Sequence, residues 1–179
     1  MKKEAPKKKS GKLSIIKVIV VLFFFIGMFC HGQALYLYRD TLLHWSFYLL
    51  ILLLGSALFA PLTRKIFHDK KDSRQLLVHF FMNLWGYSGL ILFIFFGLNF
   101  YYPKEEQKIF KCKILQTGHL LKPKISCASP YADVALNGRK YRIIFPCDYQ
   151  FKEDKFVILT LQKGLWGLDI ITDKKTLPN

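Results

Sequence analysis

Three long stretches of the chain contain no Asp, Glu, Lys or Arg, and this feature constrains the fold more than any other. They are residues 18–38, 41–63 and 75–103, which contain 21, 23 and 29 residues. A helix needs about 20 residues to cross a hydrocarbon core of about 30 Å, so each stretch is long enough to span a membrane. The stretches exclude an ordinary soluble domain, a disordered chain and a small disulfide-rich secreted protein.

The predicted membrane spans lie close to residues 18–38, 42–62 and 76–100. Lipid offers no partner to free backbone polar groups, so each span must be helical. The turn between the first two spans is short, and we expect them to be antiparallel neighbours. The expected fold class is an α-helical integral membrane protein with three transmembrane helices in region 18–102, followed by a small antiparallel all-β domain in 103–179.

Basic side chains are concentrated beside the predicted spans, on alternate sides. Residues 1–17 carry seven lysines and one glutamate, and the loop 63–75 carries five basic and two acidic residues. The turn between the first two spans has only Arg39 and Asp40. Positively charged flanks normally stay in the cytoplasm. We therefore expect the N-terminus and the loop 63–75 to be cytoplasmic, and the C-terminal domain to be outside.

The lysine-rich N-terminus indicates a membrane partner rather than a nucleic acid. The formal net charge is +15, but lysine outnumbers arginine 22 to 5, whereas base and phosphate recognition favours arginine. Attraction to anionic lipid head groups explains the lysines at the inner surface. The first span is too long for a cleaved signal peptide, so it is predicted to be an uncleaved anchor in a bacterial inner membrane, with the β domain in the periplasm.

The C-terminal domain contains one strong hairpin signal, Asn137-Gly138 between two alternating apolar runs. A two-residue loop needs positive φ at both positions, which Asn and Gly tolerate. The resulting register places Asp133 opposite Arg142, a favourable cross-strand pair. Further strands are predicted at 109–116, 120–127, 155–162 and 168–172, giving five to six short antiparallel strands in a small sheet or open barrel.

Three cysteines lie in this domain, and an oxidising compartment favours one disulfide. Extending the hairpin register places Cys127 nearly opposite Cys147, which makes Cys127–Cys147 the first choice. Cys112–Cys127 is the second choice.

Polar residues within the predicted spans include His31, Gln33, His44, His79 and Asn83. Polar groups inside a membrane are functional candidates. His31 and His44, with Cys30, form a candidate metal or haem site, although the spans contain no carboxylate to orient the imidazoles. The alternative role is structural, with interfacial histidines and one interhelical hydrogen bond. His79 and Asn83 are four residues apart and share one helical face.

Catalysis has little support, because the chain contains no nucleophile elbow, phosphate-binding loop, zinc-protease motif or dinucleotide fingerprint. No cofactor is predicted. Trp166, next to Leu165 and between two glycines, is a candidate partner contact, or else a turn residue packed over a small core. We therefore expect a non-catalytic accessory or scaffold subunit that presents its β domain to a protein partner or to another copy of itself. The alternatives are a membrane redox or metal protein that uses the span histidines, and a ligand-sensing membrane protein.

Overall fold

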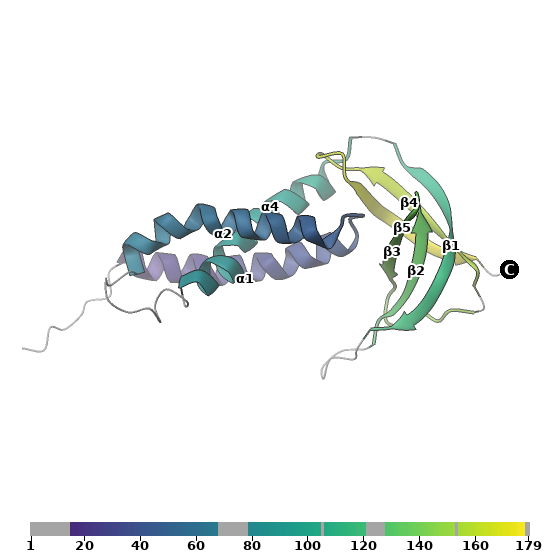
Figure 1. Ribbon diagram of the computed structural model, residues 1–179, viewed down its shortest axis with the longest axis horizontal. Coiled ribbons are helices and arrows are strands. Elements are labelled where there is room, and N and C mark those ends of the chain that lie inside the picture. The colour runs from purple at the N-terminus through teal and green to yellow at the C-terminus, as the bar shows by residue number, and fades with distance from the viewer. Residues whose placement is uncertain (1–14, 68–78, 105, 121–127, 153, 178–179) are drawn as a thin grey trace, which may run out of the picture.

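The computed structural model describes most of the chain as a helical bundle that leads into a curled β-sheet (Figure 1). It describes residues 15–67, 79–104, 106–120, 128–152 and 154–177. The lysine-rich N-terminus, most of the loop 63–75, and all of the predicted strand 120–127 except Leu120 lie outside the described residues, and so does Cys127.

Among the described residues, the helical part comprises α1 Ile15–Arg39, α2 Trp45–Phe67 and a third helix, His79–Tyr101, which includes the π-helical turn η1 Met82–Tyr87 and the segment α4 Ser88–Tyr101. α1 and α2 each pack mainly against η1 and α4, and contact each other much less. The expectation that the first two helices are direct neighbours is therefore only partly correct, because the third helical segment mediates most of their packing.

Two of the described helices are long and apolar enough to cross a membrane. They are Val18–Arg39 and His79–Tyr101, with 22 and 23 residues. Within the described residues, the apolar part of α2 is shorter, Trp45–Pro61. By length and composition the structure thus has two candidate spans, where the sequence predicted three. α2 also begins at Trp45 rather than near residue 42, because the preceding residues pair with the sheet.

Small residues let the helical backbones approach closely. A Cβ at Gly27 would lie 2.1 Å from the carbonyl oxygen of Gly86, and a Cβ at Gly89 would lie 2.1 Å from that of Gly27. Any side chain there would force α1 away from η1 and α4. Gly86 and Gly89 therefore lie on a packing face, and Gly27 is their counterpart on α1.

The C-terminal part is a five-stranded antiparallel sheet with the order β3-β2-β1-β4-β5. Its strands are β1 Lys108–His119, β2 Pro130–Leu136, β3 Arg139–Ile144, β4 Phe156–Lys163 and β5 Asp169–Leu177. The concave face buries an apolar core that includes Ala132, Val134, Ile143, Val157 and Leu159. β1 and β5 are longer than predicted, since both continue to pair with neighbouring strands beyond the expected ends.

The β2–β3 hairpin forms in the predicted register. Asn137 and Gly138 both have positive φ, 51° and 74°, as a two-residue turn of this kind requires. Asp133 pairs with Arg142 across the strands. The register was inferred from the turn alone, so this pair confirms that local turn chemistry determines the hairpin.

Candidate functional site at the junction of helices and sheet

The connection between α1 and α2 extends the sheet beyond β5. Thr41 forms a bridge with Ile170, the Leu42 N–H donates to the Asp169 carbonyl oxygen at 2.8 Å, and the Ile171 N–H donates to the Asp40 carbonyl oxygen at 2.7 Å. Backbone hydrogen bonds of this kind cover part of an edge strand that would otherwise remain unpaired. The short turn between two apolar helices is therefore also part of the sheet.

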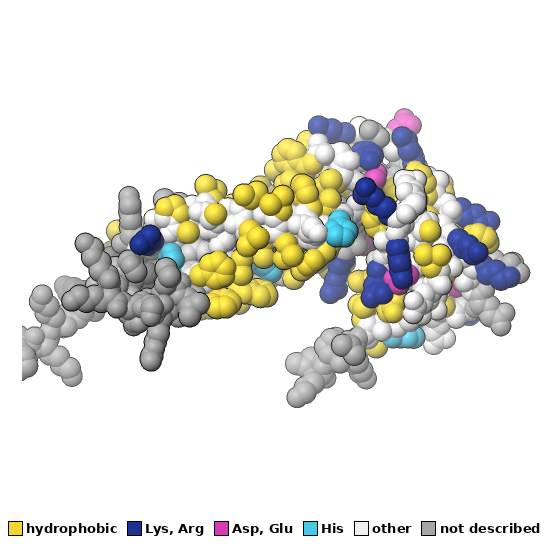
Figure 2. All heavy atoms as spheres, viewed as in Figure 1, with side chains coloured by type: hydrophobic (Ala, Val, Ile, Leu, Met, Phe, Trp, Pro, Cys, Tyr) yellow, Lys and Arg dark blue, Asp and Glu magenta, His cyan; other side chains and the backbone are white. Residues whose placement is uncertain are grey.

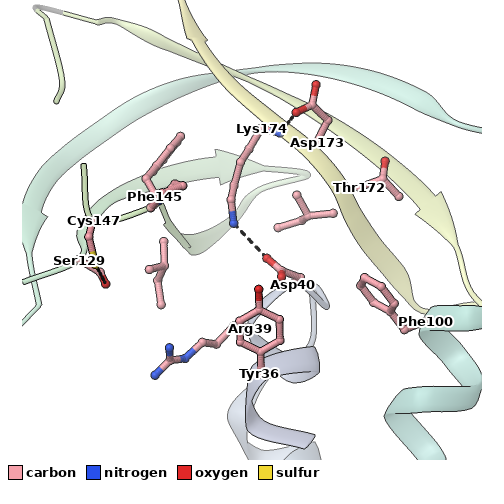
Figure 3. Close-up of a pocket in the computed structure, with 13 residues that line it drawn as sticks. Tyr36, Arg39, Asp40, Phe100, Ser129, Phe145, Cys147, Thr172, Asp173 and Lys174 are labelled. Atoms are coloured by element: carbon pink, nitrogen blue, oxygen red, sulfur yellow. Dashed lines mark hydrogen bonds and ion pairs between the residues drawn. The ribbon is translucent and has the colours of Figure 1, made fainter. Parts of the chain in front are cut away.

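An ion pair supports the same connection. Lys174 Nζ on β5 lies 3.0 Å from Asp40 Oδ1, and both side chains are largely shielded from solvent (Figure 3). The two residues are far apart in the sequence, and sequence reasoning missed the pair. The sequence did show that Asp40 is the only acidic residue in the turn, and this could have indicated an ion pair with a basic residue elsewhere in the chain.

The turn between β4 and β5 docks on α4 through Trp166. The Trp166 indole N–H donates to the Phe95 carbonyl oxygen at 3.0 Å, and its backbone N–H donates to Asn99 Oδ1 at 3.0 Å. The indole also stacks on the Phe95 ring, with a centroid distance of 5.6 Å and an interplanar angle of 6°. Trp166, predicted as a partner contact, thus contacts its own chain, while 49% of it remains exposed and Leu165 beside it is half-buried.

Asn99 is the residue of α4 whose side chain accepts a hydrogen bond from this turn. It is fully buried, and its Nδ2 has no hydrogen-bond partner within the described structure. A Cβ at Gly164 would lie 2.2 Å from the Asn99 carbonyl oxygen, so the turn reaches the helix only because this position lacks a side chain. Sequence reasoning missed Asn99, although a lone asparagine among apolar residues near the end of a span was visible.

A charged cluster lies on the β2–β3 hairpin. Asp133 is 1% exposed and accepts hydrogen bonds from Arg142 at 2.8 and 3.0 Å, and Lys140 Nζ lies 2.9 Å from its second oxygen. The hydrogen bond from Arg142 holds the pKa of Asp133 below its ordinary value, with Lys140 adding to the effect and burial opposing it. The Arg142 guanidinium also lies over the Tyr131 ring, 4.0 Å from its centroid.

A cleft of about 970 Å³ separates this hairpin from the start of α2. Its walls include Arg39 from the end of α1, Trp45 and Phe47 from the first turn of α2, and Arg139 and Arg142 from β3. Aromatic rings stack behind the cleft: Trp45 packs on Tyr48 at 5.0 Å, with an interplanar angle of 10°. The cleft therefore combines basic side chains from the sheet with aromatic side chains from the helices.

A second cavity of about 470 Å³ lies on the other side of Arg39 (Figure 3). It is bounded by the turn after α1, by β5 and by the segment after β3 that contains Cys147. Cys147 Sγ lies 3.7 Å from Ser129 Oγ, which places residue 129 beside Cys147. Cys127 lies outside the described residues, so the Cys127–Cys147 disulfide stays a prediction.

Cys112 is a free thiol buried in the sheet core, and burial raises its pKa. The second-choice pairing, Cys112–Cys127, is therefore not formed. The thiol packs among apolar side chains instead, which is the usual environment of an unreactive cysteine.

The span histidines have separate partners. His31 Nε2 lies 3.3 Å from the Tyr48 hydroxyl, whereas His44 Nδ1 lies 2.9 Å from Ser46 Oγ at the start of α2. Cys30 is a buried free thiol. Within the described part of the chain, no three His, Cys, Asp or Glu side chains lie together as a metal site would need. The arrangement fits the structural role weighed for these histidines.

A small polar network joins α2 to the third helix at the opposite end of the bundle. Thr63 Oγ1 donates to Asn83 Oδ1 at 3.1 Å, and His79 Nε2 lies 3.2 Å from Thr63 Oγ1. Asn83 is fully buried, and its Nδ2 donates to the His79 carbonyl oxygen at 2.8 Å. His79 and Asn83 therefore share one helical face, as predicted from their spacing.

Comparison with known proteins adds no further constraint. No family model matches the chain, and no curated protein or solved structure is detectably similar to it. The functional argument therefore depends on the junction and on the surfaces around it.

Proposed function

We propose that this chain is a non-catalytic accessory or scaffold protein of a bacterial inner membrane, in which three helices hold a small β-sheet at the membrane surface for a protein partner. The helices serve as the anchor, and the sheet is the presented part. The observation that carries the proposal is that the sheet is fixed to the helices at several points rather than tethered by a linker.

The exposed surface of the helices supports membrane anchoring. Only 22% of the apolar window in α1 is buried, which supports a lipid-facing helix over the core helix of a soluble protein. Large apolar side chains remain exposed around it, including Ile15 at 77%, Phe25 at 60% and Phe29 at 69%. Figure 2 shows apolar side chains along the helical part and Lys and Arg side chains over the sheet. A soluble protein rarely exposes such a continuous apolar surface.

The third proposed span, α2, is also the shortest. The apolar part of α2, Trp45–Pro61, would cover about 26 Å at 1.5 Å per residue, slightly less than a hydrocarbon core of about 30 Å. Small mismatches of this size are accommodated when flanking basic side chains extend to the lipid surface. Arg64 lies in the last turns of α2, where its side chain can do so.

Three contacts support the fixed presentation of the sheet. They are the backbone pairing of the α1–α2 turn with β5, the Lys174–Asp40 ion pair, and the docking of Trp166 on α4. Because they involve the ends of both α1 and α4, the sheet has one orientation relative to the helices. A fixed orientation is useful for a scaffold, which must offer the same surface at a constant height above the membrane.

The proposed topology places the N-terminus in the cytoplasm and the sheet in the periplasm. It depends on the lysines of the N-terminal segment and on the basic residues of the loop 63–75. Only a short cytoplasmic loop would remain, which is too small for an output domain and makes ligand sensing the weaker alternative.

Membrane integration and orientation can be tested with the native protein. We expect it to stay in the membrane fraction after alkaline carbonate extraction. Protease added to intact spheroplasts should remove the segment beyond residue 103 and spare the N-terminus. Release by carbonate would refute the anchor, and cleavage of the N-terminus alone would refute the orientation.

The partner can be sought by crosslinking in native membranes followed by mass spectrometry. A photo-crosslinking amino acid at Lys111 or Lys175, both on the sheet, should capture a defined protein or a second copy. The same amino acid at exposed Leu54 on α2 should not capture that protein. If neither sheet position gives a specific product, the scaffold role is wrong.

A further inference from the structure

The cleft between the hairpin and the start of α2 has an unbalanced positive charge. It is lined by Arg39, Arg139, Lys140 and Arg142, and no acidic side chain lines it among the described residues. Lys140 and Arg142 share Asp133, whereas Arg39 and Arg139 form no ion pair within the described structure. Even with Asp133 counted against them, the walls keep an excess of three positive charges.

The helix that begins at this cleft adds to the field. α2 starts at Trp45, and its first-turn residues Trp45 and Phe47 line the cleft. The N-terminal end of a helix carries a partial positive charge and favours anions. Basic side chains on the sheet and the helix end therefore attract the same kind of group from opposite walls.

An exposed apolar stripe leads away from the cleft along α2. Phe47 is 40% exposed and lines the cleft, and Leu50, Leu54 and Leu58 follow it with exposures of 49%, 62% and 62%. Their spacing of three or four residues places them on one helical face. An anion site thus continues directly into an apolar track.

We propose that this cleft binds the phosphate head group of an anionic phospholipid from the leaflet on the side of the sheet, with its acyl chains along α2. The inference rests on the membrane anchoring proposed above. Arg39 and Arg139 contact the phosphate, while Trp45 and Phe47 contact the glycerol region. The site is distinct from the attraction of inner-leaflet lipids to the N-terminal lysines, because it lies at the opposite end of the bundle.

The size and lining of the cleft favour a lipid over free phosphate. Its volume of about 970 Å³ is far larger than one phosphate ion needs, and about half of its lining residues are apolar or aromatic, contributed by the helices, the turn between α1 and α2, and β3. A free anion would leave this part unoccupied. A phospholipid fills both parts, because it joins a charged group to an apolar chain.

Native mass spectrometry of the full-length protein in detergent tests the proposal. Phosphatidylglycerol and phosphatidylcholine are added separately, with sn-glycerol 3-phosphate as the soluble phosphate. We expect selective retention of phosphatidylglycerol. The double variant Arg39→Gln/Arg139→Gln should bind it about 30-fold more weakly, because each basic side chain near an anionic lipid surface contributes about fivefold in affinity. The control Lys152→Gln/Lys155→Gln removes the same charge from exposed positions outside the cleft and should bind normally.

Three outcomes would overturn the proposal: equal retention of both lipids, an unchanged affinity of the arginine variant, or glycerol phosphate binding as tightly as the lipid. The last result would identify a soluble phosphate ligand instead. Circular dichroism tests whether each variant is folded. If the double variant is not folded, the single variant Arg139→Gln replaces it in the binding measurement. Carbonate extraction distinguishes failure of this inference from failure of the proposed function. If the protein stays in the membrane but shows no lipid selectivity, only the lipid-binding inference is refuted. If carbonate extracts the protein, the proposed function is refuted.

Discussion

A methyl group at position 164 should detach the β4–β5 turn from α4. In Gly164→Ala, the new Cβ would lie 2.2 Å from the Asn99 carbonyl oxygen, whereas ordinary contact begins near 3.4 Å. The neighbour is helix backbone and cannot rotate away, so the turn must move by more than about 1 Å. That shift breaks both hydrogen bonds of Trp166 to α4 and its stacking on Phe95.

The size of the effect follows from these three contacts. Each hydrogen bond contributes about 0.5–1.5 kcal/mol, and the aromatic pair contributes a similar amount. Their loss should lower the free energy of opening the turn by about 2–4 kcal/mol, which corresponds to about 30-fold or more in amide exchange.

Hydrogen–deuterium exchange of the full-length protein in detergent measures this opening. We expect faster exchange of the Trp166 amide in Gly164→Ala, together with earlier thermal unfolding of the sheet. Gly97→Ala is the matched control, because a Cβ there meets nothing within 4 Å. If both variants exchange alike at the turn, the docking of the sheet on α4 is not what fixes its position.

Three further results are expected for the C-terminal part of the chain. Asp133→Asn should lower the free energy of unfolding by about 1–3 kcal/mol at neutral pH and flatten the fall in stability at acid pH. The pKa of Asp133 is lower in the folded than in the unfolded protein, so its carboxylate stabilises the fold at pH values above the unfolded pKa, and this contribution is lost as the pH falls through the folded pKa. Thermal unfolding between pH 3 and 7 measures the effect, and an unchanged loss of stability at acid pH would contradict the reasoning. Gly138→Ala should destabilise the sheet by about 1 kcal/mol, since φ is +74° there; equal urea midpoints for the two proteins would argue against it. A non-reduced digest of protein isolated from its native membrane should contain a Cys127–Cys147 peptide, and two alkylated thiols in that digest would show that the bridge is absent.

Features that depend on neighbouring residues were predicted correctly. The hairpin is determined by Asn137-Gly138, because few residues tolerate the positive φ that its turn requires. The alternation along β4 places Val157, Leu159 and Leu161 on the buried face, as the period of two predicts. The spacing of His79 and Asn83 likewise placed them on one helical face.

Features that depend on distant parts of the chain were missed. Asp40 and Lys174 are brought together only when the α1–α2 turn joins β5. The start of α2 was predicted three residues too early for the same reason. Leu42 is apolar enough to belong to a helix, but its backbone pairs with β5 instead. The cleft, too, is assembled from two segments far apart in the sequence, residues 38–47 and 139–144, and no local pattern in either of them indicated it.

The sequence by itself determined which segments are apolar, which are basic and where the chain turns, because hydropathy, charge and backbone preference are properties of short segments. Tertiary structure alone decided how the sheet sits on the helices. That arrangement depends on an edge strand needing backbone partners, on the missing side chain at Gly164 and on a buried Asn99 within reach of Trp166. Each of these conditions is met only when segments far apart in the chain come into contact.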